Sequence, residues 1–181
     1  MPLPATANNV ALLANALMGQ PYGYGGLCQY RDCSSMMKDI MFPFGIWLPR
    51  NSGDQSKSGN FIDMAKLNKA HKQQLILEKG LPFFTLIWGP RHISLYLGNK
   101  GGKPYIFNNL WGLTTTNPKT KQEGRAVIGK AVVMPLDLGT GQDNIVITKL
   151  DNAQGMILLD QRLINPNAEL SLFKKMIKQA K

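Results

Sequence analysis

The 181-residue sequence has little cysteine and little histidine, with two residues of each type. Two cysteines cannot form the several bridges of a disulfide-stabilised scaffold, and a chain of this length buries enough surface to fold without them. A tetrahedral zinc site would need Cys28, Cys33, His71 and His92 together. The two histidines lie 21 residues apart, which does not fit the ligand spacing of a zinc finger. The sequence therefore predicts neither a disulfide framework nor a metal centre.

The sequence also lacks a long apolar run and a secretory leader. The longest apolar segment, around 81–88, has the length of a strand and falls short of the ~18 residues of a membrane span. No Lys or Arg precedes the apolar residues of segment 1–20, and three asparagines interrupt them, unlike a signal peptide. No transmembrane segment and no signal peptide are therefore expected. The chain is cytosolic, has lost a leader, is exported without one, or is one domain of a longer protein, and these explanations stay open.

Acidic residues are few: 11 Asp and Glu stand against 21 Lys and Arg, for a net charge of +10. A basic surface attracts nucleic acid, anionic lipid or anionic cell-wall polymer without reading sequence. No RNA-stacking motif is present, so no specific nucleic-acid partner is predicted. A solvated, soluble surface is the simpler interpretation of the charge. Apolar residues make up 44% of the chain and charged residues 18%, which excludes a disordered chain.

The hydrophobic period changes along the chain from helical to strand-like. Apolar residues at helical spacing predict helices over 5–18, 33–41, 69–79 and 166–178. Segments rich in β-branched and aromatic residues predict strands over 81–88, 92–97, 104–110 and 126–138. Glycine, proline and polar residues predict loops over 21–26 and 48–59. Helices followed by strands indicate an α+β fold with an antiparallel sheet.

A cysteine stands at the start of one predicted helix. Asp32 occupies the N-cap position, and Cys33 falls in the first turn. The positive end of the helix dipole lowers the pKa of a thiol at this position and favours the nucleophilic thiolate. The backbone N–H of Cys33 would also point at an oxyanion on an attacked carbonyl. Cys33 is therefore a candidate nucleophile, and a buried inert cysteine is the alternative.

A histidine and two asparagines complete the candidate chemistry. His92 begins a predicted strand, from which its ring can project toward a packed helix and act as the base for Cys33. Asn108 and Asn109 follow an apolar strand one hairpin later, where an amide can orient an imidazole. The alternatives are a histidine that hydrogen-bonds locally and two asparagines that form a turn.

These motifs occur in a fixed order. The order is Tyr22-Gly-Tyr-Gly-Gly26, Asp32-Cys33-Ser34, Leu48-Pro49-Arg50-Asn51-Ser52-x-x-Gln55-x-x-x-Gly59 and His92-Ile-x-Leu-Tyr-Leu-Gly98. Over about residues 20–113 this set resembles the NlpC-type family of papain-like cysteine peptidases, the bacterial cell-wall endopeptidases. The resemblance implies one papain-like catalytic domain over 1–181, with N-terminal helices packed on a central antiparallel sheet.

The resemblance also implies roles for the three candidate catalytic residues. It makes Cys33 the nucleophile and His92 the general base and then the general acid. Matching places the residue that orients the imidazole at Asn108, with Asn109 as the second choice. The family commonly has histidine there, so asparagine is a departure, although other papain-like enzymes use it. Cys28 is interpreted as incidental.

A substrate groove follows from the same resemblance. Tyr22 would line the pocket of the nucleophile and hydrogen-bond near the oxyanion. Asp32 and Ser34 would hold polar groups of a stem peptide, while Arg50 and Ser52 would flank the same groove. The alternative roles are a loop aromatic for Tyr22, an N-cap for Asp32 and a surface charge for Arg50.

The function that the resemblance implies is hydrolysis of peptidoglycan stem peptides through a Cys33 thioester. The expected scissile bond joins γ-D-glutamate to a diamino acid, the partners are peptidoglycan or muropeptides, and no metal or organic cofactor is needed. An amidase or acyltransferase of the same fold and a catalytically silent wall-binding module are the alternatives. The motif around Cys33 also resembles a subgroup whose catalytic domain follows Src-homology-type wall-binding domains, which this chain lacks. The family implies the bacterial envelope as location, and the cytoplasm stays open.

Overall fold

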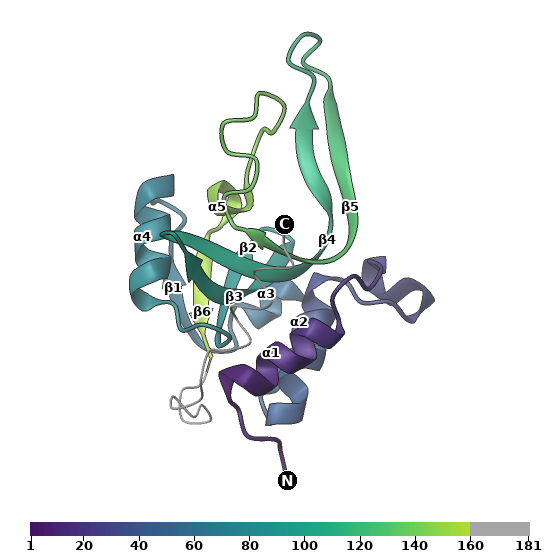
Figure 1. Cartoon of the computed structure of the whole chain (residues 1–181), viewed down its shortest axis with the longest axis vertical. Coiled ribbons are helices and arrows are strands. Elements are labelled where there is room, and N and C mark those ends of the chain that lie inside the picture. Colours follow the sequence, from purple (N-terminus) through teal and green to yellow (C-terminus); the bar gives the residue numbers. More distant parts are fainter. Residues whose placement is uncertain (160–181) are drawn as a thin grey trace.

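A computed structural model describes residues 1–159 of the chain (Figure 1). The helices are α1 (Ala7–Ala16), η1 (Tyr24–Gln29), α2 (Cys33–Met41), η2 (Phe42–Phe44), α3 (Ser52–Gln55), α4 (Lys69–Lys79) and α5 (Lys149–Asn152). The strands are β1 (Asn60–Asp63), β2 (Thr85–Gly89), β3 (His92–Lys100), β4 (Lys103–Thr116), β5 (Glu123–Pro135) and β6 (Gly155–Leu158). The helix predicted over 166–178 lies outside the described residues.

Two helices have the predicted bounds and one is shorter. Helices α2 and α4 begin and end where the periodicity predicts. The prediction of a helix over 5–18 is confirmed for α1, which begins after its N-cap Thr6 and ends two residues earlier than expected. The predicted loop over 48–59 contains the short helix α3.

The sheet has six strands in the order β1-β6-β2-β3-β4-β5, and every neighbouring pair is antiparallel. The four predicted strands correspond to β2, β3, β4 and β5. Sequence reasoning missed β1 and β6, because four residues are too few to show an alternating pattern. Strand β6 lies between β1 and β2, so the end of the described chain enters the interior of the sheet.

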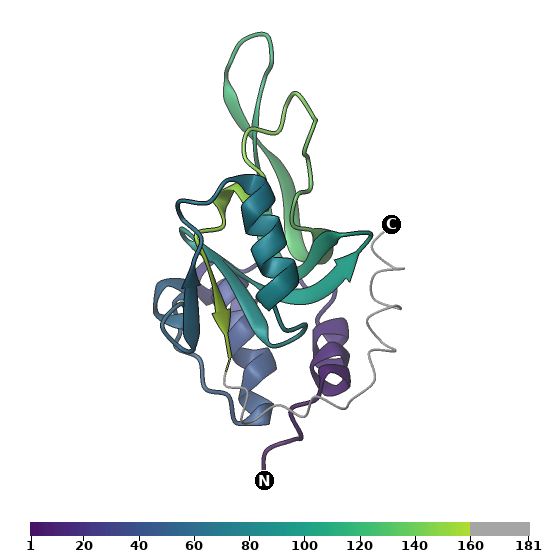
Figure 2. The ribbon, with the colours of Figure 1, turned by 90° about the vertical axis from the view of Figure 1, so that its left-hand side faces the viewer.

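Helices cover both faces of this sheet, which confirms the α+β prediction (Figures 1 and 2). One core joins α1 and α2 to strand residues such as Ile93 and Leu95. The other core joins α4 and α5 to strand residues such as Tyr96 and Ile106 on the opposite face. Because side chains alternate along a strand, β3 and β4 each send residues into both cores. The face of the sheet on which a side chain of these strands lies therefore follows from its place in this alternation.

Candidate active site

Cys33 is the first residue of α2 and is buried against the sheet. The side chain of Asp32 accepts a hydrogen bond from the Ser35 N–H, and the Ser35 hydroxyl is bonded back to Asp32, which together form a capping box. The N–H groups of Ile93 and Ser34 also hydrogen-bond the Cys33 sulfur. Because Ile93 follows His92, these contacts place the sulfur at the start of β3.

The pKa of the Cys33 thiol is raised, whereas the helix position predicted a lowered value. Burial is the largest cause, and the carboxylate of Asp32 adds to it. The Ile93 and Ser34 N–H groups and the charge of Lys149 act in the opposite direction without overcoming burial. The prediction of a lowered thiol pKa is therefore wrong for the free protein, because it counted the helix dipole and left out desolvation.

His92 hydrogen-bonds to Asn108 from the first position of β3. Its Nε2 lies 3.2 Å from Asn108 Oδ1. Asn108 Nδ2 donates to the Val132 carbonyl at 3.4 Å, which turns Oδ1 toward the imidazole. An amide oxygen only accepts, so Nε2 carries the ring proton and Nδ1 is left to accept another. The pKa of His92 is lowered to about 3 by burial, then by the charge of Lys149, against the opposing effect of Asn108.

Asn109 points to the opposite face of β4. Its Nδ2 donates to the carbonyl of Arg31, just before α2, and the residue is fully buried. Asn108 and Asn109 are therefore not interchangeable: the first contacts His92 and the second holds the start of α2 against the sheet.

Tyr22 lies in the loop beside Cys33. Its ring packs at a tilt against Trp111, with ring centroids 6.1 Å apart. Burial raises the pKa of the Tyr22 phenol to about 12, and the charges of Cys33 and Asp32 add to the effect. The phenol therefore stays protonated at neutral pH and can act as a hydrogen-bond donor.

Asp32, Ser34 and Arg50 form a hydrogen-bonded cluster next to Cys33. Arg50 donates from both terminal nitrogens to the two carboxylate oxygens of Asp32, at 3.0 and 2.6 Å, and also to the Ser34 hydroxyl at 3.1 Å. Gln55 fixes the loop that carries Arg50, because its Nε2 donates to the carbonyls of Ser34 and Pro49, both at 2.8 Å. Burial alone would raise the pKa of Asp32, but the hydrogen bonds from Arg50 and Ser35 lower it.

Ser52 is the first residue of α3, on the loop that follows Arg50. Within residues 1–159, no hydrogen bond joins its hydroxyl to this cluster. The structure thus brings Asp32, Ser34 and Arg50 together and leaves Ser52 at the side of them.

We expect Asp32→Ala to lower the free energy of unfolding by about 1–3 kcal/mol, because it removes the N-cap and leaves Arg50 without its partner. The folded pKa of Asp32 lies below the ordinary 3.8, so this stabilisation is complete above that value and is lost as pH falls below it. Urea denaturation at neutral and acid pH measures both effects. Asp39→Ala, which removes a more exposed ion pair with Arg31, should cost less than about 1 kcal/mol. Equal costs for the two variants would contradict the prediction.

Sequence reasoning missed Lys149, the first residue of α5. Its positive charge acts on both Cys33 and His92, and it lines a small cavity together with His92 and Ser94. The segment that follows β5 shows no periodicity, so no signal in the sequence placed it at this site.

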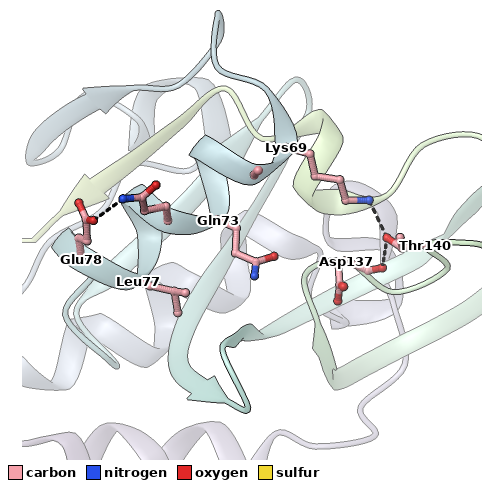
Figure 3. A pocket seen from close by; sticks show the side chains of 8 residues that line it. Lys69, Gln73, Leu77, Glu78, Asp137 and Thr140 are labelled. Atoms are coloured by element: carbon pink, nitrogen blue, oxygen red, sulfur yellow. Dashed lines mark hydrogen bonds between the residues drawn. The ribbon is translucent and has the colours of Figure 1, made fainter.

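A hollow larger than the cavity at His92 lies elsewhere, between α4 and the segment after β5 (Figure 3). Its volume is about 660 Å³, and Lys69, Leu77 and Thr140 line it. None of the predicted site residues contributes to it. In the described part of the chain, no three His, Cys, Asp or Glu side chains gather to hold a metal ion. No helix within residues 1–159 has the length and apolar character needed to cross a membrane.

The comparisons with known proteins concern the part of the chain that contains Cys33, His92 and Asn108. The NlpC/P60 family model matches residues 19–121. The γ-D-glutamyl-L-lysine dipeptidyl-peptidases of Bacillus subtilis and Bacillus cereus are 29% and 30% identical over 99 and 103 residues. These matches cover 54% and 55% of this chain but only 31% and 28% of the relatives.

Solved structures share the fold. An NlpC/P60 endopeptidase from Photobacterium damselae subsp. piscicida superposes with a TM-score of 0.73 and 30% identity over 87% of this chain and 39% of its own. An NlpC/P60 family protein from Bacillus cereus superposes with a TM-score of 0.53 at 18% identity, over 86% of this chain and 40% of its own. Because the family model matches more than half of the sequence, this chain belongs to the NlpC/P60 family, whose members are peptidoglycan hydrolases of the cysteine peptidase type.

Proposed function

We propose that this chain is a cysteine endopeptidase that cleaves peptidoglycan stem peptides at the bond between γ-D-glutamate and the diamino acid. One observation carries the proposal: the Asn108–His92 hydrogen bond stands at the start of β3, where the Cys33 sulfur also lies. A thiol, an imidazole and an amide in this order are the parts of a nucleophile, a base and an orienting group.

In the first step, Nδ1 of His92 takes the thiol proton as the Cys33 sulfur attacks the γ-carbonyl of D-glutamate. The raised thiol pKa and the lowered imidazole pKa mean that the free protein holds thiol and neutral imidazole. The proton is therefore transferred during attack. Asn108 keeps the proton on Nε2, which leaves Nδ1 able to accept the thiol proton.

The tetrahedral intermediate places a negative charge on the former carbonyl oxygen. The backbone N–H of Cys33, free in the first turn of α2, is one donor for it. The protonated phenol of Tyr22 is the second donor that we propose. Collapse of the intermediate breaks the C–N bond, and imidazolium His92 gives its proton to the departing amine.

Hydrolysis of the thioester returns the enzyme to its starting state. His92 takes a proton from water, the hydroxide adds to the thioester, and the Cys33 sulfur leaves and recovers the proton. The products are a peptide ending in D-glutamate and a fragment with a free amine on the diamino acid. No metal or organic cofactor takes part in these steps.

Substrate recognition and location are also part of the proposal. The cluster of Asp32, Ser34 and Arg50 would bind polar groups of the stem peptide beside Cys33. The names of the two Bacillus relatives support the γ-D-glutamyl bond. The chain matches less than a third of the length of those relatives. We also propose that it acts in the cell envelope as one catalytic domain over 1–181.

Mass spectrometry of defined muropeptides incubated with the reduced protein tests this function. We expect new fragments that divide the stem between D-glutamate and the diamino acid, with one water added. Cleavage at another amide bond would replace the proposed specificity. Products in which an added amine has captured the acyl group would favour an acyltransferase instead. Absence of any cleavage would contradict the proposal of an endopeptidase.

A further inference from the structure

We propose that Lys149 binds a carboxylate of the stem peptide next to the scissile bond, and that this pairing makes His92 a better proton acceptor. The inference rests on the proposed function and deepens it. It adds a binding site for negative charge from α5, apart from the Asp32, Ser34 and Arg50 cluster at α2.

Two contacts hold α5, which carries Lys149, against the end of the sheet where His92 lies. Gly89 pairs with His92 across β2 and β3, and a Cβ at Gly89 would collide with the carbonyl oxygen of Asn152. The missing side chain therefore lets α5 approach the end of the sheet. The Gln154 N–H donates to the Trp88 carbonyl at 2.9 Å, which ties the end of α5 to β2.

The backbone of α5 is fixed at its start as well. Thr148 and Asp151 form a capping box around Lys149, with the Thr148 hydroxyl 2.6 Å from the Asp151 carboxylate. On its other side, Lys72 donates to the Asp151 carbonyl at 2.8 Å. These contacts fix the backbone at Lys149, and its side chain lines a small cavity with His92 and Ser94.

The Lys149 ammonium has no carboxylate partner among residues 1–159. The charged or titratable groups that act on it are the Cys33 thiol and the Arg125 guanidinium. Burial lowers the pKa of Lys149 to about 8, and Arg125 contributes to the lowering. A half-buried cation that feels the charge of a second cation, and that has no carboxylate partner within residues 1–159, is a favourable place for an anion that arrives from outside.

The same cation opposes catalysis when it is unpaired. His92 must become imidazolium during attack, and the charge of Lys149 lowers the pKa of that imidazole. A bound carboxylate would neutralise the ammonium and remove this effect. Binding of the correct substrate would therefore raise the basicity of His92 at the moment when the base is needed.

The chemistry of the substrate supplies such a carboxylate. When glutamate is linked through its γ-carbonyl, its α-carboxylate stays free, only a few bonds from the attacked carbon. A diamino acid that carries a second carboxylate, such as diaminopimelate, offers another on the leaving side, whereas lysine does not. Both sources present the same ligand to Lys149, and substrates that lack one or the other carboxylate separate them.

Kinetics with paired substrates test the proposal. For stem peptides with the free carboxylate, Lys149→Gln should lower kcat/KM about 10-fold to 100-fold, the strength of one charged hydrogen bond. For peptides in which that carboxylate is a carboxamide, Lys149→Gln should not lower kcat/KM and should raise it slightly, because the unpaired ammonium of the wild type makes His92 a weaker base. One arm amidates the D-glutamate α-carboxylate, and the other compares diaminopimelate with lysine. Lys100→Gln removes the same charge from the exposed far end of β3 and should not change kcat/KM for the carboxylate or the carboxamide peptides.

Two further readouts keep a structural role apart from a binding role. Calorimetric titration of these peptides into Cys33→Ala measures the carboxylate preference without turnover, so it does not depend on cleavage. In wild type the preference should fall as pH rises through about 8, because Lys149 loses its proton there. Lys149→Arg should keep the preference at higher pH, since arginine stays charged.

An equal loss on carboxylate and carboxamide substrates would overturn the proposal, as would the absence of any loss. Failure of the wild-type protein to cleave any stem peptide would instead contradict the proposed function. In that case the titrations with Cys33→Ala still decide whether Lys149 binds a carboxylate. Equal affinity of Cys33→Ala for carboxylate and carboxamide peptides would overturn the inference. A preference for the carboxylate peptide that disappears when Lys149→Gln is added to Cys33→Ala would support it.

Discussion

Replacing Cys33 by alanine should lower kcat/KM for stem-peptide hydrolysis by about 1000-fold or more, because no other group in the site can form the acyl-enzyme. The side chain is buried in the core that joins α2 to the sheet. It is also small, so the variant should keep its fold. Time-resolved mass spectrometry of a single muropeptide measures the rate, and circular dichroism with a denaturation curve shows that the fold is unchanged.

Cys28 provides the matched control. It is the other free cysteine, and it is exposed on η1. Cys28→Ala should leave the rate unchanged. Iodoacetamide should alkylate Cys28 first at neutral pH, because Cys33 is buried and its thiol pKa is raised. Retention of hydrolysis by Cys33→Ala, or its loss in Cys28→Ala, would contradict the assignment of the nucleophile.

The position of Cys33 could be predicted because its signals are local. Asp32 as N-cap, the apolar spacing of α2 and Pro43 after it define a helix within a dozen residues, and the structure has the same bounds. The pKa of the thiol could not be predicted in the same way. It depends on desolvation by the sheet, which is a property of packing that the helix sequence does not contain.

The choice between Asn108 and Asn109 also depends on long-range structure that local sequence signals do not contain. Both fall on β4, and adjacent residues of a strand face opposite sides of the sheet. Only the register against β3, in which Leu95 stands opposite Phe107, decides which amide faces His92. The register depends on long-range pairing, so the sequence alone could rank the two residues but not separate them.

Lys149 was beyond prediction for a related reason. It is brought to His92 by α5 and by β6, which follows it into the middle of the sheet. Neither element is long enough to show a period, and the contact depends on the close approach allowed by Gly89. The residues that sequence reasoning found are those with local motifs, and the one it missed depends on topology.

Replacing His92 by glutamine should also lower kcat/KM by about 1000-fold, because the thiol then has no base that can take its proton. Glutamine keeps a donor for the hydrogen bond to Asn108 and has a similar size, so the loss would report on proton transfer rather than on packing. His71→Gln on the exposed face of α4 is the matched control and should have no effect. A glutamine variant that keeps more than about a tenth of the rate would contradict the role of His92 as base.

The pH profile of the wild-type enzyme gives a second, independent test of the same residue. A base with a pKa lowered to about 3 loses activity only when pH falls toward that value, so kcat/KM should stay level from about pH 7 down to about pH 5. Asn108→Asp should raise the pKa of His92, because a carboxylate beside the ring favours imidazolium, and the acid limb should move to higher pH. Asn108→Ala should lower the rate about 10-fold without that movement, because the ring loses its orientation and gains no charge. An unchanged acid limb in Asn108→Asp would show that Asn108 does not act through His92, since a purely structural asparagine could lower the rate but could not shift the titration of the base.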